Sequence, residues 1–149
     1  VCYLDLDNFK PFGDRFGFPV SDAVIGVIGE LLFDAVKGTE DFAGHIGGDD
    51  FVLFSDVGEA RGRVEWVKQE LRRRMGDLVP PEVVAAGKYT GKDRSGQIRE
   101  FPLTDISAGI LYVQPSFTGT FESLGQLAAQ VKDTAKREGS GRVVEVNVD

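Results

Sequence analysis

The sequence predicts an α/β protein of the α+β kind, in which a ferredoxin-like central antiparallel sheet is flanked by helices and carries an extra hairpin. Two observations predict this class. Strand-like apolar runs and segments with apolar residues at helical spacing follow one another in the order β-α-β-β-α-hairpin-β-α-β. The chain of 149 residues, 42% hydrophobic and 28% charged, has the length and composition of one ordinary globular domain.

The first half of the chain is expected to contain a strand, a helix and a hairpin. Residues 1–6 form an apolar run that is typical of a strand. Residues 21–36 carry apolar side chains three and four positions apart, which predicts a helix with Ser21 as its cap. Residues 42–46 and 51–55 flank a Gly-Gly-Asp-Asp turn and predict a hairpin, whose second strand is apolar on both faces, as in a central strand.

The middle of the chain predicts a second helix and a second hairpin. The helix is expected from about residue 60 to residue 75, and the Pro-Pro pair that follows ends the helical region. Residues 83–86 and 97–101 are expected to pair with each other around a turn-rich segment.

The last third of the chain predicts two strands with a helix between them. Residues 103–113 form a long strand-like run, and residues 143–148 have the pattern of a short edge strand. Between them, Ser123-x-x-Gln126 has the form of a capping box at the start of an amphipathic helix.

Charge and composition exclude several classes of function. With a formal net charge of -7 and a pI near 4.7, the chain lacks the basic face that general binding to nucleic acid or to an anionic membrane requires. It has no apolar stretch of about 18 residues that would predict a membrane span. The single cysteine, Cys2, fits a reducing compartment, so a cytoplasmic location is expected. The chain opens in a predicted core strand without an initiator methionine, which suggests that residues 1–149 are one domain of a larger protein.

Two groups of carboxylates stand at predicted strand ends. Asp5 and Asp7 close the first strand, and Asp49 and Asp50 follow two glycines in the hairpin turn. Carboxylates at the ends of buried strands are costly to desolvate unless they are paired or metal-bound, so two such groups on one sheet indicate a shared hard cation and phosphate chemistry. Plainer interpretations stay open: a solvated strand end for the first pair, and a turn that favours Gly and Asp for the second.

Further short motifs accompany these carboxylates. The motifs are Asp-Leu-Asp-Asn-Phe-Lys at 5–10, Asp14-x-x-Gly17, Gly-Gly-Asp-Asp-Phe at 47–51, a Thr- and Ser-containing strand at 103–109, and Ala135-Lys136-x-x-Gly139. In this order they resemble the GGDEF family, the diguanylate cyclase domains of bacterial cyclic-di-GMP signalling, with GGDDF as a variant of its hairpin motif. The resemblance covers almost the whole chain and implies a nucleotidyl-cyclase-type sheet.

The resemblance also implies a site that binds GTP with Mg²⁺ or Mn²⁺. The implied metal ligands are Asp5, the Leu6 carbonyl and Asp49. The implied catalytic residues are Asp49 and Asp50. The implied substrate-binding residues are Phe9, Lys10, Gly13, Asp22 and Lys136. Because the sequence has no P-loop, the turn over 8–12 would hold the phosphates with Lys10 as a point charge. Asp22 would contact guanine, although an acid in the first turn of a helix also suits the helix dipole.

The chain departs from the family pattern at three of the implied contacts. Gly13 stands where the family has a guanine-contacting Asn, and Ser140 stands where it has a phosphate-contacting Arg. Asp50 is one methylene shorter than the family's Glu, which shortens its reach by about 1.5 Å. These changes predict weak or degenerate catalysis in a protein that still binds nucleotide.

Other departures lie away from the substrate. Gly38 replaces the Arg of the family's R-x-x-D product-inhibition site, of which only Asp41 remains. His45 replaces an Arg before the hairpin and is expected to be a packed or solvent-edge side chain rather than a base. Lys132 and Asp133 replace an apolar Leu-Tyr pair in the last helix.

The reaction that the resemblance implies needs two copies of the domain. Each copy of a face-to-face homodimer would hold one GTP, and a ribose 3′-hydroxyl would attack the α-phosphorus of the partner's GTP. Covalently linked sensor or EAL-type domains are the expected partners in the parent protein, and nucleic acid is not. The alternative is a non-catalytic GTP-sensing or dimerisation module that regulates an adjacent domain such as an EAL phosphodiesterase.

Overall fold

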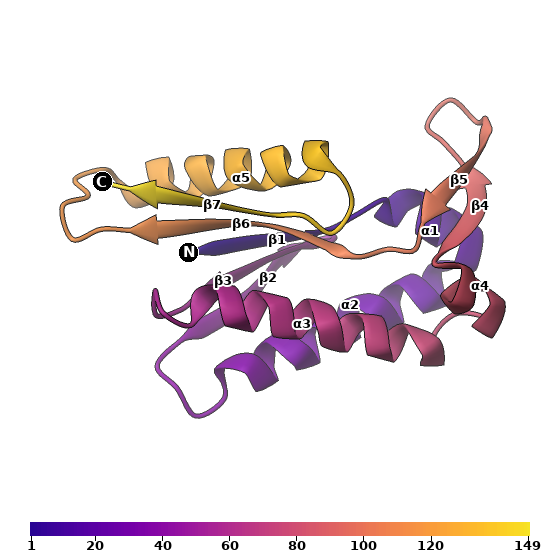
Figure 1. Cartoon of the computed structure of the whole chain (residues 1–149), viewed down its shortest axis with the longest axis horizontal. Helices are drawn as coiled ribbons and strands as arrows, with labels where there is room; N and C mark the ends of the chain where they lie inside the picture. The colour runs from indigo at the N-terminus through magenta and orange to yellow at the C-terminus, as the bar shows by residue number, and fades with distance from the viewer.

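The computed structural model describes residues 1–149 and is built on a five-stranded sheet in the order β2-β3-β1-β6-β7 (Figure 1). Its strands are β1 (Cys2–Leu6), β2 (Phe42–Gly47), β3 (Asp50–Phe54), β6 (Ile106–Val113) and β7 (Val143–Val148). Neighbouring strands are antiparallel except for β6 and β7, which are parallel because a helix crosses over between them. The first four strands in chain order follow the ferredoxin-like plan, so the predicted fold class is confirmed.

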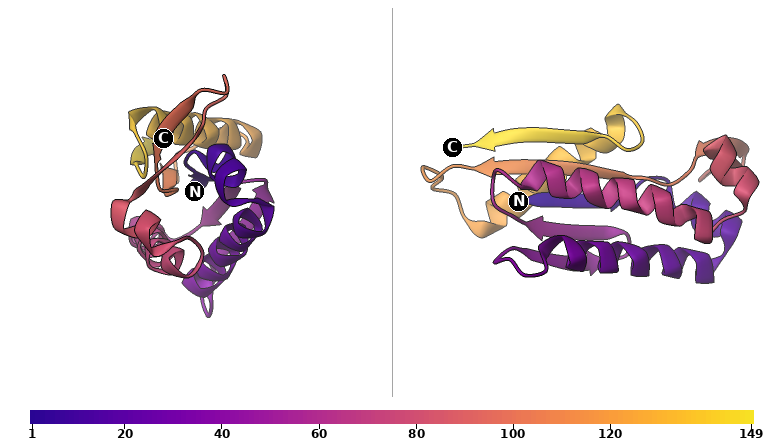
Figure 2. Two further views of the ribbon diagram at one scale, coloured as in Figure 1. Left: turned by 90° about the vertical axis from the view of Figure 1, so that its right-hand side faces the viewer. Right: turned by 60° about the horizontal axis from the view of Figure 1, so that its bottom comes forward.

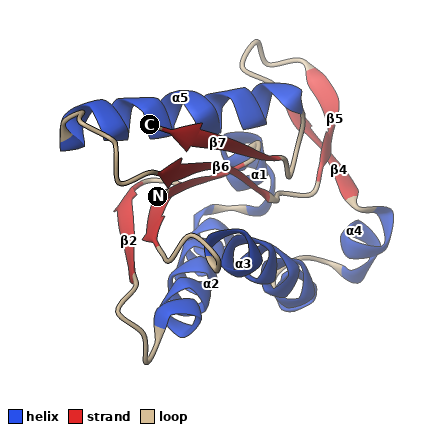
Figure 3. Cartoon of the chain, turned by 60° about the vertical axis from the view of Figure 1, so that its left-hand side comes forward, coloured by secondary structure: helices blue, strands red, loops and turns tan.

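Helices cover both faces of the sheet (Figures 1 and 3). On one face, α2 (Phe18–Val36) and α3 (Ala60–Arg74) pack together over a core of 23 buried residues. On the other face, α5 (Phe121–Glu138) covers a separate cluster of only 4 buried apolar residues. None of the helices combines the length and the apolar composition that a membrane span requires. The α5 face therefore has a smaller apolar core, and polar groups occupy part of it.

Alternation of side chains along β1 places the Asp5 carboxylate on the sheet face that α5 covers. Cys2, Leu4 and Leu6 belong to the larger core, whereas Tyr3 packs against the cluster under α5. Successive side chains of a strand point to opposite faces, so Asp5 shares the face of Tyr3. The prediction that Asp5 stands at the end of the first strand is confirmed.

An extension lies beyond one end of the sheet and contains the second hairpin (Figure 2). It contains α1 (Phe9–Phe16), which follows β1. Its other elements are α4 (Pro81–Ala86), β4 (Lys88–Lys92) and β5 (Ile98–Pro102), which follow a single 3₁₀ turn at Met75–Asp77 after α3. The Tyr89 ring of the hairpin packs edge-on against Phe12 and Phe16 of α1, with ring centroids 6.1 and 5.1 Å away. These aromatic contacts fix the hairpin beside the end of β1.

Two predictions about local secondary structure are wrong in detail. Residues 83–86 were expected to be a strand but belong to α4, because Pro81 opens a helical turn and Gly87, at a φ of 66°, closes it in the left-handed conformation. The hairpin instead begins at Lys88. Residues 8–12 were expected to be a turn, but α1 begins at Phe9.

Helix starts also differ from the prediction. α2 begins three residues before Ser21, whose hydroxyl donates to the Gly17 carbonyl instead of capping the helix. α5 begins at Phe121, and its cap is Thr120, whose side chain accepts a hydrogen bond from the Ser123 N–H. The predicted capping box at Ser123 is therefore one helical turn too late. β6 likewise begins only at Ile106, since the preceding residues connect it to the hairpin.

Candidate functional site

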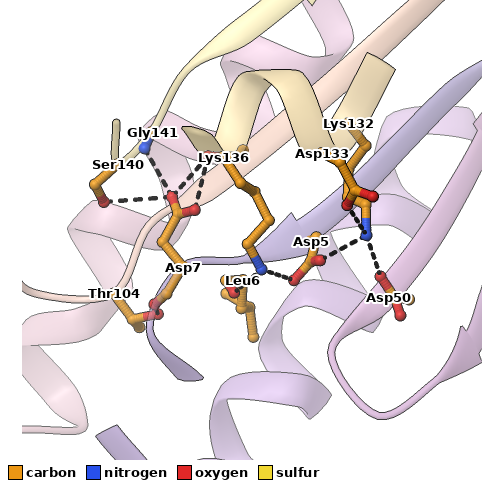
Figure 4. A network of polar contacts seen from close by, with 11 residues as sticks. Asp5, Leu6, Asp7, Asp50, Thr104, Lys132, Asp133, Lys136, Ser140 and Gly141 are labelled. Atoms are coloured by element: carbon orange, nitrogen blue, oxygen red, sulfur yellow. Dashed lines mark hydrogen bonds and ion pairs between the residues drawn. The ribbon is translucent and has the colours of Figure 1, made fainter. Parts of the chain in front are cut away.

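Asp5 lies at the end of β1 beneath α5, and both of its carboxylate oxygens accept hydrogen bonds from lysines of that helix (Figure 4). Lys132 donates to Oδ2 at 2.9 Å, and Lys136 donates to Oδ1 at 2.6 Å. Burial alone would raise the pKa of this carboxyl, but the two ammonium groups hold it below its usual value. Asp5 is therefore a buried, ionised carboxylate that already binds cations.

Lys136 places its positive charge between the predicted metal ligands. Its ammonium group donates to the Leu6 carbonyl at 3.1 Å as well as to Asp5, so it contacts two of the three predicted oxygen donors. The third, Asp49, lies close by, because the Leu6 N–H donates to the Asp49 carbonyl at 3.3 Å. A bound ammonium at this position is what a site for a hard cation would hold without its metal.

The residues present fit a Mg²⁺ ion that shares its coordination with nucleotide and water. Asp5 and Asp49 can supply carboxylate oxygens and Leu6 a carbonyl oxygen, and Mg²⁺ commonly takes its remaining ligands from phosphates and water. No three His, Cys, Asp or Glu side chains gather in the structure as a metal-binding cluster. A metal here would therefore have the Asp5, Asp49 and Leu6 oxygens as its protein ligands and complete its coordination with water or phosphate oxygens.

The turn between β2 and β3 brings two more carboxylates to Asp5. Gly48 adopts a φ of 56°, which glycine reaches without strain, and the His45 ring hydrogen-bonds the Gly48 carbonyl at 2.9 Å. Burial, and after it the negative charge of Asp5, raises the pKa of both Asp49 and Asp50. Asp49 and Asp50 thus each lie close enough to Asp5 for its charge to act on them, and a cation beside Asp5 would relieve this repulsion.

Asp7 has a different environment from Asp5, although it belongs to the same motif. Its side chain is buried, and both carboxylate oxygens accept hydrogen bonds from the Ser107 hydroxyl, at 2.7 and 2.9 Å. The Gly141 N–H donates at 2.7 Å and the Ser140 hydroxyl at 3.3 Å. Burial raises the pKa of Asp7 more than these donors lower it. Asp7 therefore joins β1 to β6 and to the loop after α5, and the plainer interpretation of a solvated strand end is wrong for both aspartates.

A pocket of about 590 Å³ opens beside this acidic group. Its volume is in the usual range for small-molecule sites. It lies between the start of α1, the turn of the β4–β5 hairpin and the end of α5. Predicted site residues that line it are Leu6, Phe9, Lys10, Asp49 and Lys136. The structure thus brings together residues that are up to 130 positions apart in the sequence.

The hairpin adds basic residues to this pocket that the sequence did not single out. Lys92, Arg94 and Arg99 line it together with Lys10 and Lys136. Arg99 lies 3.6 Å from Asp93 within the hairpin, whereas Lys92 and Arg94 are exposed and make no ion pair. The basic residues face the pocket from several elements, which suits a ligand with several negative charges.

Two predicted substrate-binding residues, Gly13 and Asp22, lie outside the pocket lining. Gly13 is in α1, close to α2, and a Cβ at this position would lie 2.9 Å from the Ser21 hydroxyl oxygen. Asp22 is exposed on α2, and its contact with guanine stays a prediction. Lys10 is also exposed and pairs with Asp14 at 2.8 Å, a surface contact that a phosphate could replace.

Lys132 is the residue of this site that sequence reasoning noticed but gave no role. Its ammonium lies 3.6 Å from Asp50 and 3.2 Å from Asp133, in addition to its hydrogen bond with Asp5. It also lies 5.0 Å from the centre of the Tyr3 ring. The signal that could have identified it was the replacement of an apolar pair by Lys-Asp on a helix that must cover a sheet.

Asp41, the remaining residue of the product-inhibition motif, is engaged within the protein. Arg63 pairs with it at 2.9 Å, the Ser55 hydroxyl donates to it at 3.0 Å, and the Asp56 N–H donates at 3.2 Å. Its side chain is 14% exposed. These contacts use the carboxylate to hold the start of β2 against α3.

His45 lies on the sheet face away from the carboxylates. Its ring stacks on Phe51 with centroids 4.6 Å apart, and it bonds the turn at Gly48. The prediction that His45 is a packed or solvent-edge side chain agrees with this exposed position.

Comparisons with known sequences match the motifs. The family model described as "Diguanylate cyclase, GGDEF domain" matches residues 1–78. The probable diguanylate cyclase DgcT of Escherichia coli is 30% identical over 147 residues, which cover 97% of this chain and 28% of that protein. The diguanylate cyclase DgcS of Shewanella oneidensis is 40% identical over 53 residues, which cover 36% of this chain and 18% of that protein. The chain spans less than a third of the length of these relatives.

Solved structures share the fold at low sequence identity. The GGDEF domain of DgcB from Caulobacter crescentus, in complex with c-di-GMP, has a TM-score of 0.67 and 21% identity, covering 97% of this chain and 75% of that chain. The active GGEEF domain of a diguanylate cyclase from Vibrio cholerae has a TM-score of 0.61 and 19% identity, and the match covers 97% of this chain and 80% of that chain. An EAL/GGDEF domain protein from M. capsulatus has a TM-score of 0.56 and 22% identity, with 97% and 81% covered.

Proposed function

The chain belongs to the diguanylate cyclase GGDEF family, and on this premise we propose that it binds GTP with Mg²⁺ or Mn²⁺ at the end of β1 and that its cyclase activity is weak or degenerate. The observation that carries the proposal is the cation position at Asp5. There the Lys136 ammonium bonds both Asp5 and the Leu6 carbonyl, at the edge of a pocket rich in basic side chains.

The acidic end of the site would hold the metal. Asp5, Asp49 and the Leu6 carbonyl would bind it in place of the Lys136 ammonium. Once bound, the metal would neutralise charge on the phosphates and orient them. Lys136 is 31% exposed and carries its charge on a flexible stem, so it can turn from Asp5 toward the phosphates when the metal arrives.

The basic end of the pocket would hold the triphosphate. Lys10 would exchange its surface partner Asp14 for phosphate, and the N–H groups at the start of α1 favour an anion. Lys92 and Arg94 have no competing ion pair and would meet the phosphates from the hairpin. Asp22 would contact guanine, with Gly13 leaving one of the family's base contacts unmade.

Catalysis would require a homodimer with one GTP in each copy. Asp49 and Asp50 would be the catalytic residues that act on the attacking ribose hydroxyl, and the shorter Asp50 reaches less far than a glutamate. Each missing contact costs about 1–3 kcal/mol where it leaves a buried group unpaired, so the losses at Gly13, Asp50 and Ser140 together would slow turnover by orders of magnitude.

A non-catalytic regulator is the second candidate, and one observation favours it. Asp50, which replaces the family's Glu, lies 3.6 Å from the Lys132 ammonium. The positive charge of Lys132 therefore partly neutralises this predicted catalytic carboxylate. In that case the domain would sense GTP, or mediate dimerisation, next to a sensor or EAL-type domain of a cytoplasmic parent protein. The low coverage of its relatives is compatible with further domains.

Calorimetry and product analysis separate these functions. We expect GTP binding that depends on Mg²⁺, and little cyclic-di-GMP by mass spectrometry at high protein concentration. Mg²⁺-dependent binding without product supports a GTP sensor, absent binding supports a dimerisation module, and vigorous synthesis would make the protein a working cyclase.

A paired variant tests the cause of weak synthesis. The Gly13→Asn, Asp50→Glu double variant restores two family side chains, and we expect it to form more product than the wild type. Gly13→Ala is the matched control, because any Cβ at this position approaches the Ser21 hydroxyl at 2.9 Å. If Gly13→Ala alone lowers nucleotide affinity, then the Cβ is crowded against Ser21. In that case the behaviour of the double variant would not report on a contact made by Asn.

A further inference from the structure

Asp5 and Asp50 are direct neighbours on β1 and β3, and they put two negative charges on the same sheet face. Their Cα atoms are register partners in the antiparallel pair, so their side chains project side by side under α5. Like charges at such a position destabilise a sheet unless a cation lies between them. One carboxylate oxygen of Asp50 is buried without a hydrogen-bond partner. The pair is therefore a potential binding position for a second cation, distinct from the one at Leu6.

We propose that Lys132 is the resident cation of this second position, and that its ammonium keeps a second divalent ion out, so that the domain binds one divalent ion where the carboxylates alone would bind two. This inference rests on the metal position of the proposed function. It adds a specific role for a side chain of this chain: Lys132 sets the number of metal ions.

The two lysines donate hydrogen bonds to different carboxylate oxygens of Asp5 (Figure 4). Lys136 bonds Oδ1 and the Leu6 carbonyl, which marks the position facing the pocket. Lys132 bonds Oδ2 at 2.9 Å and lies 3.6 Å from Asp50, which marks the position between the strands. The two cation positions at Asp5 are thus occupied separately, by residues one helical turn apart.

Burial makes Lys132 the less displaceable of the two. Its side chain is 11% exposed, against 31% for Lys136. Its ammonium lies over the aromatic ring of Tyr3, 5.0 Å from the ring centre. Gly109 on β6 allows α5 to lie directly on the sheet here, since a Cβ at Gly109 would come within 2.5 Å of the Lys132 backbone nitrogen. The Lys132 side chain is consequently enclosed between α5 and the sheet more fully than that of Lys136.

Its charge is also well compensated where it lies. The Asp5 carboxylate accepts a hydrogen bond from its ammonium at 2.9 Å, and the carboxylates of Asp133 and Asp50 lie 3.2 and 3.6 Å away. A divalent ion between Asp5 and Asp50 would lie against this ammonium and be repelled by it. An ion at Leu6 and Asp49 would displace only the more exposed Lys136.

Counting bound Mn²⁺ tests the proposal on the 149-residue chain without nucleotide. Equilibrium titration of the wild type should give one Mn²⁺ per chain. Lys132→Met keeps the length of the side chain and removes its charge, and it should bind a second equivalent. Arg137→Met is the matched control, because it removes an exposed charge from the same helix, and it should bind one equivalent like the wild type.

The outcomes separate this inference from the proposed function. Two equivalents of comparable affinity in the wild type, or one equivalent in a folded Lys132→Met variant, would overturn the role of Lys132. No Mn²⁺ binding to the wild type would instead overturn the metal site itself. If Lys132→Met unfolds without metal, the proposal expects saturating Mn²⁺ to restore its folded circular dichroism. Failure to do so, while the Lys132→Met, Asp50→Asn double variant folds and binds one equivalent, would also contradict the proposal.

Discussion

Asp5 lies at the end of β1 and Asp7 two residues later, in the turn that follows, yet their partners differ in kind. The oxygens of Asp5 accept from two lysine ammonium groups, one of which is partly exposed at the pocket. The oxygens of Asp7 accept from hydroxyl and backbone N–H donors that belong to the fold itself, at Ser107 and Gly141. A carboxylate held by the partly exposed ammonium of Lys136 can exchange that ammonium for a metal, whereas one held by neutral donors of the fold cannot be released without breaking the structure.

The titration behaviour of the two carboxyls follows the same division. Against the effect of burial, the lysines hold the pKa of Asp5 below its usual value, whereas burial raises the pKa of Asp7 beyond what its neutral donors can offset. One D-x-D motif therefore contains a ligand-binding residue and a structural one.

The largest effect is expected from removing Asp7. Asp7→Ala leaves the Ser107 hydroxyl and the Gly141 N–H without an acceptor, and each buried donor costs about 1–3 kcal/mol, so the free energy of unfolding should fall by about 3–5 kcal/mol. Urea denaturation measures this loss. Ser140→Ala, which loses only a 3.3 Å hydrogen bond, should cost less than about 1 kcal/mol. A loss for Asp7→Ala as small as that control would mean that Asp7 is not structural.

Asp5→Asn should chiefly affect binding. An amide offers Mg²⁺ a neutral oxygen instead of a charged one, so GTP affinity in Mg²⁺ should fall at least 30-fold, about 2 kcal/mol. Calorimetry with and without Mg²⁺ checks this, with the exposed Asp133→Asn as the control for loss of one charge. Equal GTP affinity of the wild type in EDTA and in Mg²⁺ would refute the metal assignment.

Asp49→Asn should stabilise the protein when metal is absent. Burial and the charge of Asp5 oppose ionisation of Asp49, so its neutralisation should raise the free energy of unfolding in EDTA by about 0.5–1 kcal/mol. The same substitution should abolish the stabilisation that Mg²⁺ and GTP give the wild type. Thermal unfolding under both conditions measures the two effects, and a destabilised variant in EDTA would show that Asp49 has a structural partner after all.

The smallest effect is the pH dependence of these differences. The pKa of Asp49 in the folded state is raised above 3.8, so its contribution to stability is full below that value and is lost as the pH rises through the folded pKa. The gain from Asp49→Asn in EDTA should therefore shrink as the pH falls from 7 toward about 4. The pKa of Asp5 is lowered, so its contribution is present above 3.8 and disappears only as the pH falls through the folded pKa. If the free energies of unfolding of Asp49→Asn and Asp5→Asn changed with pH in the same direction, this would contradict the opposite pKa shifts of Asp49 and Asp5.

Much of the fold could be predicted from local pattern. Alternation in residues 1–6, helical spacing in 21–36 and the Gly-Gly-Asp-Asp turn each depend on neighbours within a few positions, and they predicted β1, α2 and the first hairpin correctly. The errors fall where a short segment carries an ambiguous pattern. Val83 and Val84 favour a strand, but Pro81 before them and Gly87 after them bound a single helical turn.

The sequence by itself determined the family, the fold class and the two carboxylate groups, because these are carried by residue type and spacing. It did not distinguish Asp5 from Asp7, and it left Lys132 without a role. Only the tertiary structure decided these points, because it places α5 across β1, more than 120 positions away in the sequence. Whether a buried carboxylate meets an ammonium or a hydroxyl depends on such long-range packing, and that partner determines whether it holds a ligand or holds the fold.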